Sequence, residues 1–267
     1  MSKYAGNTVL ITGGNGGIGL EMARSFHAKG WKTVICGRNQ ETLDAAATEM
    51  PGLVAIQCDV SSAADREVLF AELKLKAQCI DVFVNNAAIN KAHDYADSFT
   101  LDHDRAREEI EINYVAPIEL TRMWLNWREE AGQENRGAGL VMVNTPGSLI
   151  PLEANIMYCS TKAGLHMFTL ILRRQLRNTN VKVMEVFPPG LETGLAVDLA
   201  VPSQGQKPAD AVATVSQSIV DSVLAGEEVI LPHPESVFLY SNFAPKYDEG
   251  LLDKMNLGVQ RREGWNS

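Results

Sequence analysis

Short, nearly continuous apolar runs alternate along the chain with longer stretches of helical character. The apolar runs cover Thr8–Thr12, Lys32–Cys36, Leu53–Gln57, Val82–Asn85, Leu140–Asn144, Val181–Phe187 and Val229–Leu231. Runs of this kind are typical of strands covered on both faces, as in a parallel sheet. The stretches between them predict helices, including Gly19–Lys29, Glu41–Glu49, Ala63–Ala77, Glu108–Arg128 and Tyr158–Arg177.

This alternation predicts an α/β fold in a single domain. Repeated strand–helix–strand units form right-handed crossovers, so we expect a Rossmann-type, doubly wound sheet of seven parallel strands with helices on both faces, over residues 1–267. Two segments depart from the alternation: Gly194–Pro208 predicts a loop, and residues 232–267 predict an aromatic-containing tail that packs on the domain or on a partner subunit. In such folds the ligand binds beyond the carboxyl ends of the strands.

Composition narrows the range of partners. The 267 residues are 45% hydrophobic with a net charge of -9, which suits one large domain and disfavours nucleic acid. No stretch is long and apolar enough to span a bilayer and no signal peptide is evident, so we expect no membrane partner and a cytoplasmic location. Cys36, Cys58, Cys79 and Cys159 form no CxxC pair and the histidines lack metal spacing. We therefore expect buried, reduced thiols and no metal site.

The first predicted strand ends in a glycine-rich turn, Thr12-Gly-Gly-Asn-Gly-Gly-Ile-Gly19. Glycines let the backbone approach a ligand closely, and the helix that follows presents free N–H groups to a pyrophosphate. The turn therefore predicts a dinucleotide cradle made by Gly13, Asn15, Gly17, Ile18 and Gly19; the alternative is an ordinary glycine-rich turn.

The second predicted strand ends in Gly37-Arg38, where an acidic residue would favour NAD(H). Arg38 can instead grip a 2′-phosphate, so NADP(H) is preferred over NAD(H); the alternative is a solvated surface arginine. After the third strand, Asp59 is expected at the adenine edge beside Val60, or else as the N-cap of the next helix.

Tyr158 and Lys162 lie four residues apart in a predicted helix, so both side chains share one face. A free tyrosine has a pKa of about 10 and is a poor acid–base catalyst at neutral pH. A nearby ammonium favours the phenolate, and such a tyrosine can exchange a proton with a carbonyl or alcohol oxygen.

With these motifs in this order, the chain resembles the short-chain dehydrogenase/reductase family from about Asn7 to Thr193. The resemblance is carried by five motifs: Thr12-Gly13-x-x-x-Gly17-Ile18-Gly19, Asn85-Asn86-Ala87-Ala88, Asn113, Tyr158-x-x-x-Lys162 and Pro189-Gly190-x-x-Thr193. The stretch Leu172–Leu195 further resembles a subgroup of reductases linked to D-alanyl esterification of cell-wall polymers.

The resemblance implies roles for individual residues. Tyr158 would be the acid/base, Lys162 would hold the nicotinamide ribose and tune Tyr158, and Asn113 would hold the water of a proton relay. Thr193 would contact the nicotinamide end of the cofactor, and the loop 194–208 would cover the substrate. The implied cofactor contacts also include Asn86, Ala87, Pro189 and Gly190.

The chain departs from the family pattern at three places. The usual catalytic serine corresponds to Thr145, since 158 − 145 = 13 residues, with Ser148 as a second candidate hydroxyl and Pro146 able to reshape the loop. Ala88 stands where a glycine is usual, and Gly16 stands where many NADP(H)-using members carry a basic residue. Specificity for NADP(H) would then depend on Arg38 alone.

Three functions follow as hypotheses. The leading one is NADP(H)-dependent hydride transfer to or from a small carbonyl or alcohol substrate. The second is a non-redox step with bound cofactor, such as isomerisation, cyclisation or elimination, and the third is non-catalytic nucleotide sensing. Broad apolar faces on Glu108–Arg128 and Tyr158–Arg177 predict a homodimer or homotetramer, with burial inside the domain as the alternative.

Overall fold

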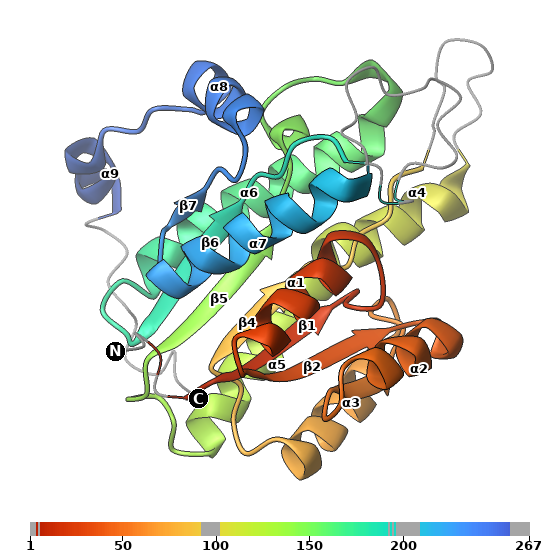
Figure 1. Ribbon diagram of the computed structural model, residues 1–267. Coiled ribbons are helices and arrows are strands. Elements are labelled where there is room, and N and C mark those ends of the chain that lie inside the picture. Colours follow the sequence, from red (N-terminus) through yellow and green to blue (C-terminus); the bar gives the residue numbers. More distant parts are fainter. Residues whose placement is uncertain are drawn as a thin grey trace.

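The chain forms a seven-stranded parallel sheet in the order β3-β2-β1-β4-β5-β6-β7 (Figure 1). The computed structural model describes residue 4 and residues 6–91, 102–191, 193, 195 and 209–256. The strands are β1 (Thr8–Thr12), β2 (Lys32–Gly37), β3 (Val54–Gln57), β4 (Val82–Asn85), β5 (Ala138–Val143), β6 (Val181–Val186) and β7 (Val229–Ile230). The predicted doubly wound sheet is confirmed, and each predicted strand lies within two residues of an observed one.

Helices cover both faces of this sheet. The residues of α1 (Gly17–Ala28), α2 (Gln40–Glu49) and α7 (Ala209–Ala225) pack into one apolar core. A second core lies on the other face, under α3 (Ala63–Lys76), α5 (Ala116–Glu130) and α6 (Ile156–Gln175). Strand side chains alternate between the two, as Ile11 and Leu10 do in β1, which explains why the strands are apolar without interruption.

The stretch predicted as one helix over Glu108–Arg128 is divided into three parts. They are α4 (His103–Ile110), a π-type turn η1 (Glu111–Val115) and α5. The start lies earlier than predicted because the Asp102 carboxylate accepts the N–H groups of Asp104 and Arg105 as an N-cap. Pro117 has no N–H for the carbonyl of Asn113, four residues before it, so regular α-helical bonding is interrupted at this point.

Most of the apolar residues behind the predicted association faces are buried within the domain. Ile112, Leu120, Trp124 and Trp127 of the first stretch, and Leu165 and Leu172 of α6, all belong to the second core. The alternative explanation, burial inside the domain, therefore accounts for them. The exposed apolar residues of α6 are different ones, Ile156, Met167 and Ile171.

The tail contains two helices, α8 (Pro234–Phe243) and α9 (Glu249–Asn256). Helix α8 packs on the domain through Tyr240, whose ring contacts the ring of Phe187 edge-on at 5.0 Å. Phe238 and Phe243 on the same helix are exposed. Most of the predicted loop Gly194–Pro208, and residues 257–267 of the tail, lie outside the described residues.

Two further observations concern the described part of the chain. No helix there has the length and apolar character needed to cross a membrane. All four cysteines are free thiols, with Cys36 and Cys58 buried and Cys79 and Cys159 half-buried, so the expectation of buried thiols is right for two of the four.

Candidate active site

A cleft of about 670 Å³ lies where the strands of the sheet end. Within the described residues it is lined by the ends of β2, β4, β5 and β6 and by the first turns of α1 and α6. Every predicted site residue except Asn113 lines this cleft: Gly13, Asn15, Gly17, Ile18, Gly19, Arg38, Asp59, Val60, Asn86, Ala87, Thr145, Tyr158, Lys162, Pro189, Gly190 and Thr193. The fold thus brings together residues that are up to 180 positions apart, from Gly13 to Thr193.

The glycine turn is too tightly packed to hold side chains at most of its glycine positions. Gly13 and Gly17 have φ of 63° and 51°, a region that glycine enters without strain. A Cβ on Gly19 would lie 2.3 Å from the Gly13 carbonyl oxygen, and one on Gly17 would lie 3.0 Å from Thr193 Cβ. Gly16 caps α1 without any side-chain hydrogen bond, so the first N–H groups of the helix remain available to an anion. This cradle fits a pyrophosphate.

Thr12 ties this turn to the end of β4. Its hydroxyl oxygen accepts the N–H groups of Asn86 at 2.9 Å and Ala87 at 3.0 Å. The Asn86 side chain in turn donates to the carbonyls of Thr12 at 2.8 Å and Gly13 at 3.3 Å. Asn86 therefore supports the turn from beneath, and Thr12 is a supporting residue that sequence reasoning quoted only as part of the motif.

Gly37 and Arg38 border the cleft at the end of β2. A Cβ on Gly37 would lie 2.1 Å from Asn15 Oδ1, so the glycine makes room for the Asn15 side chain, which donates to Thr42 at 2.7 Å. The Arg38 side chain is 53% exposed, and its Nη1 lies 3.3 Å from Glu108 Oε1. An exposed pair of this kind contributes only about 0–1 kcal/mol, so a stronger anion can displace Glu108.

Asp59 lies at the cleft but is already engaged with its neighbour. Its Oδ1 accepts the backbone N–H of Ser61 at 2.9 Å and the Ser61 hydroxyl at 2.7 Å. The N-cap of α3 is Ser62, whose hydroxyl oxygen accepts the Asp65 N–H at 3.2 Å. The alternative expectation that Asp59 caps this helix is therefore wrong; the cap falls on Ser62 because its side chain, not that of Asp59, reaches an N–H of the first turn.

Tyr158 and Lys162 lie together near the start of α6, and both are buried. Lys162 Nζ is 5.9 Å from the centre of the Tyr158 ring and donates to the Val143 carbonyl oxygen at 2.9 Å. Burial lowers the pKa of Lys162 to about 8, although the Glu185 charge acts in the opposite direction. The shared face predicted from the i, i+4 spacing is confirmed.

Burial raises the pKa of Tyr158 well above its ordinary value, and a hydrogen bond with the Thr145 side chain opposes this only in part. In the chain by itself the net shift of this pKa is upward, because loss of hydration on burial is the largest effect. Tyr158 is therefore held as the protonated phenol at neutral pH.

Thr145 stands beside Tyr158 in the position expected for the family's serine. Its hydroxyl oxygen also accepts the Gly147 N–H at 3.2 Å, which starts the short helix η2 (Pro146–Ser148). Pro146 occupies the first position of that turn, where its missing N–H is harmless. Ser148 instead donates to the Thr145 carbonyl at 2.7 Å and is not among the described residues that line the cleft.

Asn113 is fully buried in η1, behind the cleft wall. Its side chain accepts the Ile89 N–H at 2.9 Å and donates to the Ile89 carbonyl at 2.8 Å. These bonds engage the side chain with the backbone that follows β4. Pro117 deprives the Asn113 backbone carbonyl of its usual α-helical donor.

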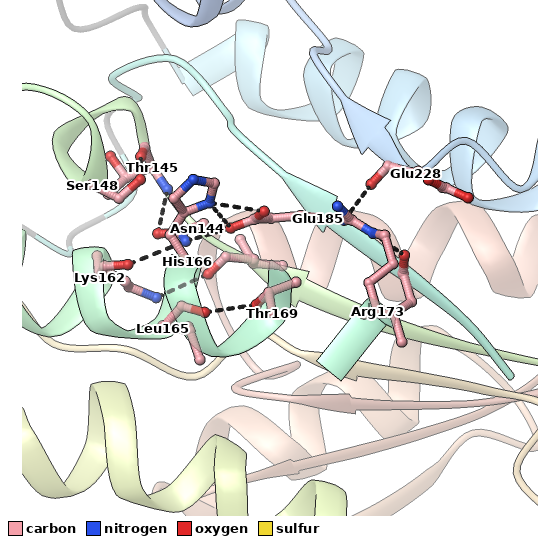
Figure 2. Close-up of polar contacts among 12 residues, drawn as sticks. Asn144, Thr145, Ser148, Lys162, Leu165, His166, Thr169, Arg173, Glu185 and Glu228 are labelled. Atoms are coloured by element: carbon pink, nitrogen blue, oxygen red, sulfur yellow. Dashed lines mark hydrogen bonds and ion pairs between the residues drawn. The ribbon is translucent and has the colours of Figure 1, made fainter. Parts of the chain in front are cut away.

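A buried polar cluster behind Lys162 escaped the sequence reasoning (Figure 2). It consists of Asn144 after β5, Glu185 in β6 and His166 in α6, all of them buried. Two signals could have found it: a glutamate inside the apolar run Val181–Phe187, and a histidine one helical turn after Lys162.

In the described residues, no group of three or more His, Cys, Asp or Glu side chains could hold a metal.

Comparison with known proteins gives one consistent result. The family model for short chain dehydrogenases matches residues 7–202. The chain is 38% identical over 196 residues to the uncharacterized oxidoreductase DltE of Bacillus subtilis (strain 168), covering 72% of this chain and 75% of that protein. This similarity confirms the subgroup that Leu172–Leu195 predicted.

Two more distant similarities agree with it. Dehydrogenase/reductase SDR family member 7B of Mus musculus is 30% identical over 207 residues, which are 74% of this chain and 62% of that longer protein. A short-chain dehydrogenase from Sphingobium yanoikuyae, solved in complex with NADPH, superposes with a TM-score of 0.74 at 20% identity, covering 96% of this chain and 97% of that one.

Proposed function

The chain belongs to the short-chain dehydrogenase family, and from this premise we propose that it is an NADP(H)-dependent enzyme that transfers a hydride between the cofactor and a small carbonyl or alcohol substrate. The observation that carries the proposal is the buried Tyr158–Lys162 pair, which borders the same cleft as the glycine turn. Bound NADPH would supply the hydride.

The residues of the chain supply a proton and its surroundings. Tyr158, held as a phenol, gives its proton to the carbonyl oxygen of the substrate and becomes a phenolate. Lys162 carries a positive charge beside that ring at neutral pH, which stabilises the phenolate as it forms. Thr145 can orient the same carbonyl oxygen through its hydroxyl.

Preference for NADP(H) is supported by the end of β2. Gly37 offers no carboxylate to bind a ribose 2′-hydroxyl or repel a 2′-phosphate, and Arg38 stands next to it. Among the described residues that line the cleft, Arg38 and Lys162 are the cations, and Lys162 lies at the other end beside Tyr158. A 2′-phosphate would therefore have to use Arg38, in exchange for its weak pair with Glu108.

The remaining parts of the proposal concern the substrate, the assembly and the location in the cell. Leu195, described within the segment 194–208, lines the cleft, which supports a substrate-covering role for that segment. The exposed Met167 and Ile171 on α6 support a homodimer or homotetramer, which light scattering would test. The four free thiols support a cytoplasmic location, which a tagged chain would test in cells.

The test is a cofactor assay. Purified protein is incubated with NADPH and a panel of aldehydes and ketones, and the reduced-nicotinamide absorbance is followed. We expect that absorbance to fall with at least one carbonyl compound and that NADPH binds more tightly than NADH. Product formed without any change in absorbance would indicate a non-redox reaction instead. Failure to bind either nucleotide would refute the proposal.

A further inference from the structure

A carboxylate is buried directly behind the candidate acid–base residues. Glu185 lies near the carboxyl end of β6, between β5 and β7 in the sheet, and its side chain is 1% exposed. Isolated carboxylates are very costly to bury, so such a group needs hydrogen bonds and a counter-charge. Its contacts show which parts of the molecule provide them.

The hydrogen bonds come from two neighbours (Figure 2). Glu185 Oε1 accepts from Asn144 Nδ2 at 2.7 Å, and His166 Nδ1 lies 2.9 and 3.0 Å from the two carboxylate oxygens. The His166 ring is also packed edge-on against Phe187 at 5.7 Å. His166 Nδ1 must carry a proton to serve the carboxylate, which fixes the tautomer of the ring.

Two groups could supply the counter-charge, His166 and Lys162. His166 Nε2 is buried and has no hydrogen-bond partner among the described residues. A neutral ring leaves only a lone pair there, whereas an imidazolium would bury an unsatisfied N–H donor and a second positive charge, which costs more. The Glu185 charge acts on Lys162, where it offsets part of the effect of burial.

Asn144 connects this carboxylate to both halves of the acid–base group. Its Nδ2 also donates to the Lys162 carbonyl oxygen at 3.3 Å, and its Oδ1 accepts the Thr145 N–H at 3.0 Å. Both amide ends therefore have fixed partners, so the side chain has one arrangement that satisfies them all. Glu185 holds that arrangement by accepting the shortest of these bonds.

We propose that Glu185 is a positioning residue for the reaction: its carboxylate balances the charge of Lys162 and, through Asn144, sets Thr145 and α6 relative to each other, while neutral His166 holds the carboxylate in place. This inference rests on the proposed function for its catalytic meaning. Its physical content, a charge coupling between Glu185 and Lys162, exists whether or not turnover is found.

Few other charged or titratable groups among the described residues lie near Lys162 and Glu185. On α6, Tyr158 lies on the other side of Lys162, and Glu109 of α4 acts on Tyr158. From α8, Tyr240 faces Glu185, whose charge adds to the effect of burial in raising the pKa of Tyr240; Arg173 opposes it. The pKa of Lys162 is set by burial and, in the opposite direction, by the Glu185 charge. A change in the Lys162 titration on removal of Glu185 would therefore report this coupling.

The experiment follows Lys162 directly. Lysine side chains are isotope-labelled, the Lys162 signal is assigned with a Lys162→Met variant, and its chemical shift is titrated by NMR. In Glu185→Gln we expect the midpoint to move to lower pH by about one pH unit, because the favourable negative charge is lost. Glu185→Asp keeps the charge and should leave the midpoint near that of the wild type. Thr169→Val is the matched control, since it removes a buried α6 hydroxyl that bonds only the Leu165 carbonyl.

The same variants are then assayed with NADPH and a carbonyl substrate. Activity that needs the Lys162 ammonium falls as pH rises through its pKa, so this alkaline limb should move to lower pH in Glu185→Gln, with kcat roughly tenfold lower. Thr169→Val should shift neither the limb nor the midpoint. If the wild type shows no turnover, the proposed function fails while the NMR titration still decides the coupling.

Two outcomes would overturn the inference. One is a Lys162 midpoint in folded Glu185→Gln equal to that of the wild type. The other comes from His166→Gln, which also serves if Glu185→Gln does not fold. Replacing a neutral ring should leave the midpoint unchanged, whereas a marked rise would mean that an imidazolium had been repelling Lys162 and balancing Glu185.

Discussion

The two halves of the cleft present their polar groups by different physical means. On the half formed by β1 and β2, backbone N–H groups and glycine positions make the surface, and the nearby cation, Arg38, is exposed and weakly paired. On the half formed by β5, β6 and α6, the groups are the buried side chains of Tyr158 and Lys162, with Glu185 buried behind them. The polar surface of the first half therefore depends on the absence of side chains, whereas that of the second half depends on side-chain charges.

This difference teaches where each half is vulnerable. Backbone donors keep their charge whatever the pH, so the glycine half should respond mainly to added volume. Buried ionisable groups shift their pKa values with every neighbouring charge, so the tyrosine half should respond to changes that leave its shape intact. Four substitutions sharpen or break this contrast.

The largest effect is expected on the tyrosine half. Tyr158→Phe keeps the ring and removes the proton, so we expect kcat to fall about 10²–10⁴-fold while NADPH affinity stays near that of the wild type. Steady-state kinetics and a fluorescence titration with NADPH measure the two quantities. Equal turnover in wild type and variant would mean that Tyr158 is not the acid/base and would remove the contrast between the halves.

Arg38→Asp tests the exposed cation of the other half. Loss of a charge-assisted contact and gain of a repelling carboxylate should weaken NADPH binding by about 10–100-fold, with little change for NADH. Arg122→Asp is a suitable control, because Arg122 is also exposed and paired with a glutamate, Glu119, but does not line the cleft. A parallel loss of both nucleotides in Arg38→Asp would contradict the proposed contact with a 2′-phosphate.

Gly19→Ala tests sensitivity to volume. The added Cβ would lie 2.3 Å from a backbone oxygen, so the turn must shift, and we expect a loss of about 1–2 kcal/mol in the free energy of unfolding. Gly16→Ala is the matched control, because a Cβ there meets nothing within 4 Å and φ is -167°. Urea denaturation of both variants measures the difference, and equal losses would show that the clash is not the cause.

Thr145→Ser is expected to have the smallest effect. It keeps the hydroxyl beside Tyr158 and removes one methyl group, so we expect kcat to change by no more than about threefold. Thr145→Ala removes the hydroxyl and should lower kcat clearly further. If both variants behaved alike, the Thr145 hydroxyl would have no part in orienting the substrate.

Most residues of the cleft could be predicted because they belong to local sequence motifs. The glycine turn, the Gly37-Arg38 pair and the Tyr158/Lys162 spacing each lie within a few residues, and the parallel sheet brings the ends of its strands to one edge. The π-type turn at Glu111–Val115 could not be found from apolar periodicity, although Pro117 marks the missing donor. The polar side chains of Asn144, His166 and Glu185 were missed because each stands alone in an apolar or helical stretch.

The sequence by itself determined the fold class, the glycine turn and the candidate acid–base pair, because these follow from residue periods and spacings along the chain. Only the tertiary structure decided the charge states around that pair. Burial and neighbouring groups set the pKa values of Tyr158 and Lys162, and those neighbours include Thr145 after β5, Glu185 in β6 and Glu109 in α4, which no local spacing relates to α6. Desolvation and Coulomb interactions depend on distance in space, which folding alone establishes.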